Sequence, residues 1–465
     1  MKMDEAEVQK RLLRYETILD EAPRISRAVR QVCHDAENRI IDIQLKDSYS
    51  GILYLTVFAP ALIGFVEWVL EKTLREGKNR LYFLSRDGWQ MYLIAKKMVE
   101  ENRLPIECRY LNVSRYSMKL PAYCMDIDAG IESICVGGID VTPQRILRRA
   151  ALTDAECAVT MEEIGAADDT ENILNYRDVI ALREKLKQSR NVRWFIQEHS
   201  AAAYNNAIGY LIQEGLCRDG SYYLVDSGWI GTLQCSIEKM VQSINPEIKV
   251  EGCYFGMYEY PPNADRKRFN TYYFSPKGDI RNKLYFSNSL FETIVSSEEG
   301  MTYGYEHNTG SYVPVRLDNN NPNGQQMRNN IKILEHLLDI VSFDWCRAQL
   351  IDRKTIYKLF RMFMAEPAQL EVSAYGNSLF SDNVLDDGYK NVAAKLDIEQ
   401  IKDQRFASKL LIILGIKKKT LHESAWLEGS AVRAYSDNPE KLKKEFRHIR
   451  FYKGFVYLKK QMKVW

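Results

Sequence analysis

The chain has 465 residues, of which 46% are hydrophobic and 27% are charged, a composition typical of a globular protein with more than one packed module. Its formal net charge is only +2 and the basic residues are spread along the chain, which argues against nucleic-acid binding. Nine scattered cysteines without a CxxC pair argue against a structural zinc and fit a reducing compartment. The first residues mix both charge signs and lack a secretion signal, so we expect a cytoplasmic protein.

Residues 1–45 form the first predicted module, one or two charged helices that brace the outside of the fold. An uncharged apolar run follows at 52–66, with Pro60 in its middle. A membrane span needs about 20 apolar residues, and Glu67 ends this run too early. We therefore expect a buried core helix, with a membrane-embedded segment as the alternative.

Residues 46–316 alternate short β-rich runs with helical runs, which predicts an α/β catalytic domain built on a parallel sheet flanked by helices. A helical stretch at about 144–216 is too long for a simple crossover, and we interpret it as a cap inserted beside the site. Turn-forming residues from 318 onward mark a boundary, and 329–465 predicts a mainly helical C-terminal domain. The predicted strands are 80–84, 108–113, 222–225, 250–257 and 271–274.

The first candidate site motif is the turn Ser85-Arg86-Asp87-Gly88, which connects a predicted strand to a helix. Free backbone N–H groups and the positive end of the helix dipole meet at such a turn and attract phosphate. Arg86 can add a bidentate contact, and Asp87 can cap the helix or hold a metal. The alternative is an ordinary connecting turn.

The second motif repeats this arrangement after the strand at 222–225, in the sequence VDSGWIGT. Two glycines permit close backbone approach, and a threonine at the helix start offers a cap and a phosphate contact. In open parallel sheets ligands bind at the carboxyl ends of strands, so both loops should face one crevice. The residues concerned are Asp226, Ser227, Gly228, Trp229, Gly231 and Thr232.

Two further side chains are candidates for the same crevice. Arg115 follows the strand at 108–113, and its alternative is a surface arginine. Glu292 lies among aromatic and glycine residues, a mixture that sugar sites favour, and its alternative is a solvated helix face. No serine hydrolase, zinc peptidase or Walker motif occurs in the sequence.

The VDSGWIGT motif resembles the phosphate-binding signature of type I phosphoribosyltransferases, and Ser85-Arg86-Asp87-Gly88 resembles the pyrophosphate loop of that fold. Together with NVSR at 112–115, the two loops resemble polysaccharide-biosynthesis proteins that carry a haloacid-dehalogenase-type phosphatase beside this module. The resemblance covers roughly residues 50–310. Two departures are Ser227, in place of a second acidic residue, and a slightly shorter loop to Gly231.

The resemblance implies a donor, 5-phosphoribosyl 1-diphosphate (PRPP), a glycan acceptor that can be lipid-linked, and Mg²⁺. A separate phosphatase would then remove the 5-phosphate and leave ribofuranose. Asp226 would orient the ring, Arg86 would stabilise departing pyrophosphate, and Asp87 or Glu292 would take the acceptor proton. The donor-binding set would be Ser85, Gly88, Arg115, Ser227, Gly228, Trp229, Gly231 and Thr232, with no metal ligand assigned.

Two other functions stay open at this point. A glycosyltransferase that uses a nucleotide sugar could hold its diphosphate in the same loops, although the sequence lacks a convincing metal motif. A catalytically silent glycan-binding or scaffold subunit is the alternative from a different class.

The last 25 residues, 441–465, carry nine Lys or Arg and one Glu, interleaved with aromatic residues. A final helix that packs its aromatic side chains on the body explains this pattern. The alternative is peripheral attachment to the inner surface of the membrane, because anionic lipid attracts basic segments by about 1 kcal/mol per residue.

Overall fold

The computed structural model describes residues 4–38, 40, 45, 49–136, 141–317, 322–344, 349–381, 388–413, 416–417, 419 and 421–462. The first part of the predicted boundary, 318–321, and the end of the basic tail, 463–465, lie outside these residues.

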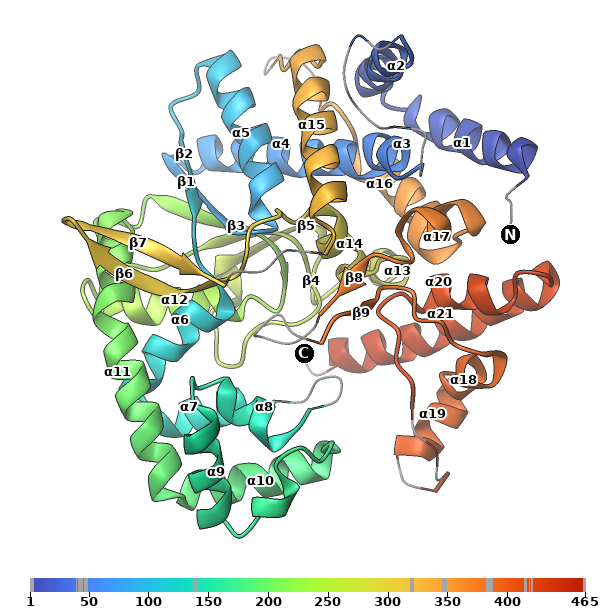
Figure 1. Cartoon of the computed structure of the whole chain (residues 1–465). Helices are drawn as coiled ribbons and strands as arrows, with labels where there is room; N and C mark the ends of the chain where they lie inside the picture. Colours follow the sequence, from blue (N-terminus) through green and yellow to red (C-terminus); the bar gives the residue numbers. More distant parts are fainter. Residues whose placement is uncertain are drawn as a thin grey trace.

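A five-stranded parallel sheet stands at the centre of the fold, with the order β2-β1-β3-β4-β5 (Figure 1). This confirms the prediction of an α/β protein with a parallel sheet. The third strand is longer than the predicted 222–225, because Asp226, Gly228 and Trp229 continue the pairing with the fourth strand. The strands are β1 (Arg80–Leu84), β2 (Glu107–Leu111), β3 (Tyr222–Trp229), β4 (Gly252–Met257) and β5 (Phe269–Phe274).

Helices cover both faces of the sheet, and the two central strands are buried on both sides. Leu81, Phe83 and Val225 join the larger hydrophobic cluster, whereas Tyr82 and Leu224 join a second cluster on the opposite face. This alternation follows from the two-residue period of a β-strand. The larger cluster includes α5 (Gly88–Asn102), and the second includes α12 (Thr232–Gln242).

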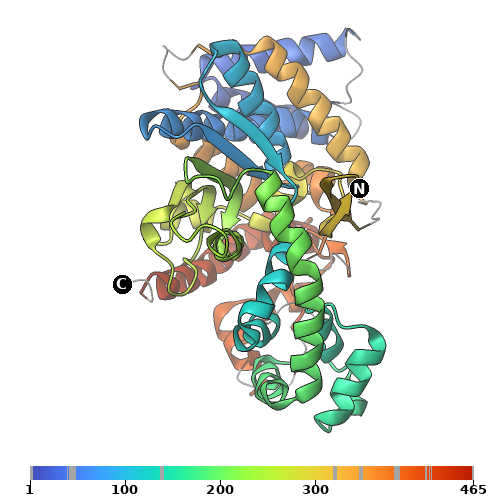
Figure 2. The ribbon, with the colours of Figure 1, turned by 90° about the vertical axis from the view of Figure 1, so that its left-hand side faces the viewer.

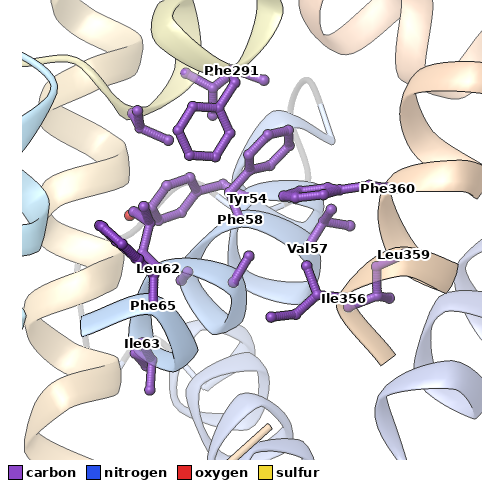
Figure 3. Packing of buried hydrophobic residues seen from close by; sticks show 14 of the residues in the cluster. Tyr54, Val57, Phe58, Leu62, Ile63, Phe65, Phe291, Ile356, Leu359 and Phe360 are labelled. Carbon is purple, nitrogen blue, oxygen red and sulfur yellow. The ribbon is translucent and has the colours of Figure 1, made fainter. Parts of the chain in front are cut away.

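The apolar run at 52–66 lies inside one long helix, Ser50–Arg75, made of α3 (Ser50–Leu53), a π-helical turn (Tyr54–Phe58) and α4 (Ala59–Arg75). By length and composition this helix could cross a membrane, but 83% of its most apolar 18-residue stretch is buried inside the protein. Its aromatic and aliphatic side chains pack against Phe291 and Phe360 (Figure 3). The segment is therefore a core helix of this fold.

The chain between β2 and β3 forms a lobe of helices that projects from the sheet (Figures 1 and 2). Its own hydrophobic cluster runs from Tyr116 to Ile196 and includes Met301. The helices are α6 (Arg115–Ala122), α7 (Ile127–Ile134), α8 (Pro143–Arg148), α9 (Asp154–Glu163), α10 (Tyr176–Gln188) and α11 (Arg190–Gln213).

An antiparallel hairpin packs on α6 and α11. Its two strands are not among the predicted ones. Tyr305 stacks on Tyr210 with ring centroids 4.4 Å apart, and Tyr303 stacks on Tyr116 at 4.7 Å. The strands are β6 (Thr302–Asn308) and β7 (Ser311–Arg316), and α13 (Ile280–Leu284) and α14 (Asn288–Val295) precede them.

The C-terminal region is mainly helical, as predicted, and it shares one hydrophobic core with the sheet and the N-terminal helices. That core extends from Val8 to Ile449. The N-terminal helices are α1 (Glu5–Leu19) and α2 (Pro23–Glu37). The C-terminal elements are α15 (Gly324–Ile340), α16 (Arg353–Phe360), a π-helical turn (Arg361–Ala365), α17 (Gln369–Tyr375), β8 (Leu379–Phe380), β9 (Lys390–Asn391), α18 (Ile398–Asp403), α19 (Phe406–Ile413), α20 (Leu427–Ala434) and α21 (Pro439–Met462).

Candidate functional site

A pocket of about 240 Å³ opens at the carboxyl ends of β1 and β3, and both candidate loops line it. The two strands are neighbours, with Phe83 opposite Val225, so the residues that follow them lie side by side. The structure brings together nearly all of the candidate residues in this lining: Ser85, Arg86, Asp87, Arg115, Asp226, Ser227, Gly228, Trp229, Gly231, Thr232 and Glu292.

The first loop turns sharply at Arg86, whose φ is 72°, and its backbone N–H donates to the Tyr110 hydroxyl at 2.9 Å. Asp87 precedes α5 but makes no capping bond. Its carboxylate instead accepts a hydrogen bond of 2.5 Å from Ser227 Oγ, which links the two loops. Gly88 lies outside the pocket lining. A Cβ added at Gly88 would lie 3.0 Å from the Phe83 carbonyl carbon. It permits close helix-to-strand packing.

The second loop depends on glycine at two positions. Gly228 has a φ of 112°, and an added Cβ there would meet the Gly256 carbonyl oxygen at 2.4 Å. Gly231, with a φ of 75°, occupies the N-cap position of α12. The expectation that Thr232 caps this helix is therefore wrong, because Thr232 is already the first helical residue. No side chain caps α12, and its N-cap and first residues, Gly231, Thr232 and Leu233, line the pocket.

Three carboxyl groups meet in the pocket, and burial raises the pKa of each. The pKa of Asp226 rises to about 7, first through desolvation and then through repulsion from Asp87. Desolvation also raises the pKa of Asp87. Desolvation and then repulsion from Asp87 raise the pKa of Glu292 to about 8. The Glu292 carboxylate accepts a hydrogen bond from the Trp229 indole. The site thus holds protons that ordinary carboxyl groups would have lost at neutral pH.

Two arginines oppose these carboxyl groups. Arg115 is exposed at the start of α6, and its charge lowers the pKa values of Asp226 and Glu292 against the larger effect of burial. The charge of Arg86 likewise lowers the pKa values of Asp87 and Glu292. Guanidinium groups bind phosphate oxygens with two parallel hydrogen bonds, so the pocket combines anion-binding cations with hydrogen-bonding carboxylates.

A divalent metal fits this donor set only in part. The described residues contain no group of three His, Cys, Asp or Glu side chains arranged to hold an ion. Mg²⁺ is commonly held by one or two carboxylates together with substrate phosphates and water. Asp226 and Asp87, which interact electrostatically across the pocket, fit that arrangement.

Part of the pocket lining comes from the C-terminal region, and this part was not predicted from the sequence. Leu379 and Phe380 of β8, together with Tyr389, line the pocket, and so do Asn323 and Met327 around the start of α15. No local motif marks these residues, since only the packing of distant segments brings them to the site. Among the described lining residues, none belongs to the stretch 144–216.

The assembled pocket combines two arginines and a helix start, which suit an anion, with three buried carboxyl groups, and Glu292 can accept a proton there only in its ionised form. Its polar groups converge at the carboxyl edge of a parallel sheet, the usual ligand position in such folds. No model of a known protein family matches the sequence, and no curated protein matches it either.

Proposed function

We propose that this chain is a glycosyltransferase of glycan biosynthesis that transfers 5-phosphoribosyl from PRPP to a sugar acceptor and releases pyrophosphate. The observation that carries the proposal is the pairing of two phosphate-type loops across one pocket, joined by the bond between Asp87 and Ser227. A type I phosphoribosyltransferase-like fold and a cytoplasmic location are parts of the same proposal.

The reaction breaks the bond between the anomeric carbon and the pyrophosphate oxygen and forms a bond from that carbon to the acceptor oxygen. Negative charge develops on the leaving group, where Arg86 and Arg115 stabilise it. Mg²⁺, when bound, would neutralise pyrophosphate charge as a Lewis acid. Asp226 holds the ring hydroxyls, and Glu292 takes the acceptor hydroxyl proton, because its raised pKa makes the ionised form a stronger base.

The size of the pocket supports a compact donor. Its volume of about 240 Å³ is below the roughly 300–1,000 Å³ typical of ligand pockets. A pentose with a 5-phosphate and a 1-diphosphate needs less room than a nucleotide sugar, which contains a second sugar and a base beside its diphosphate. This difference favours PRPP over the nucleotide-sugar alternative. The retained phosphate-type loops favour an enzyme over a silent scaffold subunit.

Replacing Arg86 with Ala should lower transfer from PRPP by about 100-fold or more, because the leaving pyrophosphate loses a charged donor. The measurement is pyrophosphate release in the presence of Mg²⁺, PRPP and glycan acceptors. Arg103→Ala is the matched control, since Arg103 also has a positive φ, 50°, and follows the same helix at its other end. A nucleoside diphosphate product from nucleotide sugars, with no reaction from PRPP, would refute the proposed donor.

Mg²⁺ alone should raise the melting temperature more above pH 8 than below pH 7. As pH rises through the raised pKa values of Asp226, about 7, and Glu292, about 8, the folded protein must carry charges that the unfolded chain carries at no cost. Stability therefore falls over this range, and a bound cation offsets the loss. Thermal unfolding with and without Mg²⁺ measures the effect. An equal Mg²⁺ shift in Asp226→Asn would place the ion elsewhere.

A further inference from the structure

The last helix, α21, exposes an apolar stripe on its outer side. Phe451 is 65% exposed, Phe455 45%, Leu458 51% and Met462 71%. Their spacing of four, three and four residues places all four on one face of the helix. The opposite side of α21 packs on the body through Phe446 and Ile449.

A second helix extends this stripe. Phe406 at the start of α19 contacts Phe455 and Phe451, with ring centroids 4.6 and 6.0 Å apart. Leu410 follows one turn later on the same face of α19 and is 44% exposed. We call the set Leu410, Phe451, Phe455, Leu458 and Met462 the tail patch. Exposed apolar side chains that gather in this way mark an interaction surface.

The cations of α21 are divided by face. On the inner side, Arg450, Lys453 and Lys460 pair with Glu366 at 3.0 Å, Glu428 at 2.6 Å and Glu259 at 2.7 Å, respectively. On the outer side, Lys444, Arg447 and Lys459 are exposed and have no acidic partner within the described part of the chain. The inner charges are therefore neutralised inside the protein, while the outer ones remain available to an external anion.

We propose that the tail patch docks this protein on an anionic membrane surface. The apolar side chains enter the boundary between headgroups and acyl chains, and Lys444, Arg447 and Lys459 contact the lipid phosphates from the same face. Two-fold pairing with a second copy is less suitable, because antiparallel α21 helices would bring Lys459 of one chain toward Arg447 of the other. A negatively charged surface complements both features of the patch.

Aromatic contacts connect the patch to the pocket. Tyr457 of α21 stacks on Tyr258 with ring centroids 5.3 Å apart, and Tyr258 lies 6.0 Å from Trp229, which lines the pocket. A membrane that contacts α21 is thereby held in a fixed position relative to the site. If the proposed transfer is correct, this geometry favours acceptors that are themselves attached to lipid.

Vesicle flotation of the full chain, without donor or acceptor, tests the docking separately from transfer. The protein should float with phosphatidylglycerol-containing vesicles at low salt, and not with phosphatidylcholine alone or at high salt. The triple variant Lys444→Glu, Arg447→Glu, Lys459→Glu should bind at least about 100-fold more weakly, because the loss of three basic residues at about 1 kcal/mol each already gives that factor and the new carboxylates add repulsion. Phe451→Ser with Leu458→Ser should also abolish flotation.

Matched controls lie on other exposed helices. Lys10→Glu, Arg14→Glu and Arg27→Glu reverse three exposed charges on α1 and α2, and they should leave flotation unchanged. The proposal is overturned if the protein fails to float with anionic vesicles, or if the tail variants float as well as the unaltered chain. It is also overturned if the unaltered chain is a dimer that does not bind vesicles, and light scattering shows that the apolar variant is a monomer.

Discussion

Asp226→Asn should reduce phosphoribosyl transfer by about 100-fold or more without lowering stability. The amide keeps the size of the side chain but loses its negative charge. That charge orients the sugar ring and stabilises the positive charge that develops on the ring in the transition state. Because burial and Asp87 raise the pKa of Asp226 to about 7, the folded protein is destabilised as pH rises from the unfolded value of this group through 7. Removing the ionisable group removes that loss. Pyrophosphate release and melting temperature, measured above pH 7, check both parts.

Asp437→Asn provides the control for this result, because Asp437 is exposed and lies outside the pocket. That variant should match the unaltered chain in both measurements. Near-normal turnover in Asp226→Asn would remove this residue from the site. A fall in melting temperature above pH 7 would show that the carboxylate stabilises the fold and would contradict the raised pKa.

Glu371→Ala should destabilise the protein by about 3–5 kcal/mol, the usual cost of removing one partner from a buried ion pair. The Glu371 side chain is fully buried, and its carboxylate accepts hydrogen bonds of 2.7 Å from both Arg11 and Tyr15 of α1. Its second oxygen accepts the Ala368 N–H at 2.7 Å. Without the carboxylate, the buried Tyr15 phenol loses its acceptor, and the largely buried Arg11 guanidinium keeps only the carbonyl oxygens of Met362 and Glu366. Urea unfolding, followed by tryptophan fluorescence, measures the change.

The control is Glu399→Ala, since Glu399 pairs with Lys402 at the surface of α18 and exposed pairs contribute little. Its unfolding midpoint should not move. If Glu371→Ala unfolded at the same urea concentration as the control, the hydrogen bonds between α1 and α17 would contribute little to the free energy of unfolding.

The sheet could be predicted from sequence because its strands are apolar, β-prone and bounded by turns. All five were located, and only β3 was clearly too short, because Asp226 and Ser227 resemble loop residues although β4 holds them in the ladder. The pairing of the two loops followed from the rule that ligands bind at the carboxyl ends of parallel strands. The roles of the residues at those ends stay predictions.

Other features were harder to predict for identifiable reasons. The β6–β7 hairpin has a local turn signal in Asn308-Thr309-Gly310, but the alternation of the residues on either side is weak. Gly88 is predicted to contact the ligand, but it lies outside the pocket lining, and the space at Phe83 requires glycine there. Phe380 and Tyr389 reach the pocket only through tertiary packing, about 150 residues or more after the loops they face. No local pattern encodes such a contact.

The shared core also has a consequence for how the protein is made. Val8 and Ile449 belong to the same hydrophobic cluster, so that cluster closes only after nearly the whole chain has left the ribosome. Until the C-terminal helices are made, the helix Ser50–Arg75 lacks part of the cover for its apolar side chains, including Phe360 and Phe363. Exposed surface of this kind makes nascent chains prone to aggregation and dependent on chaperones. We therefore expect chaperones to bind this helix until the C-terminal helices have been synthesised.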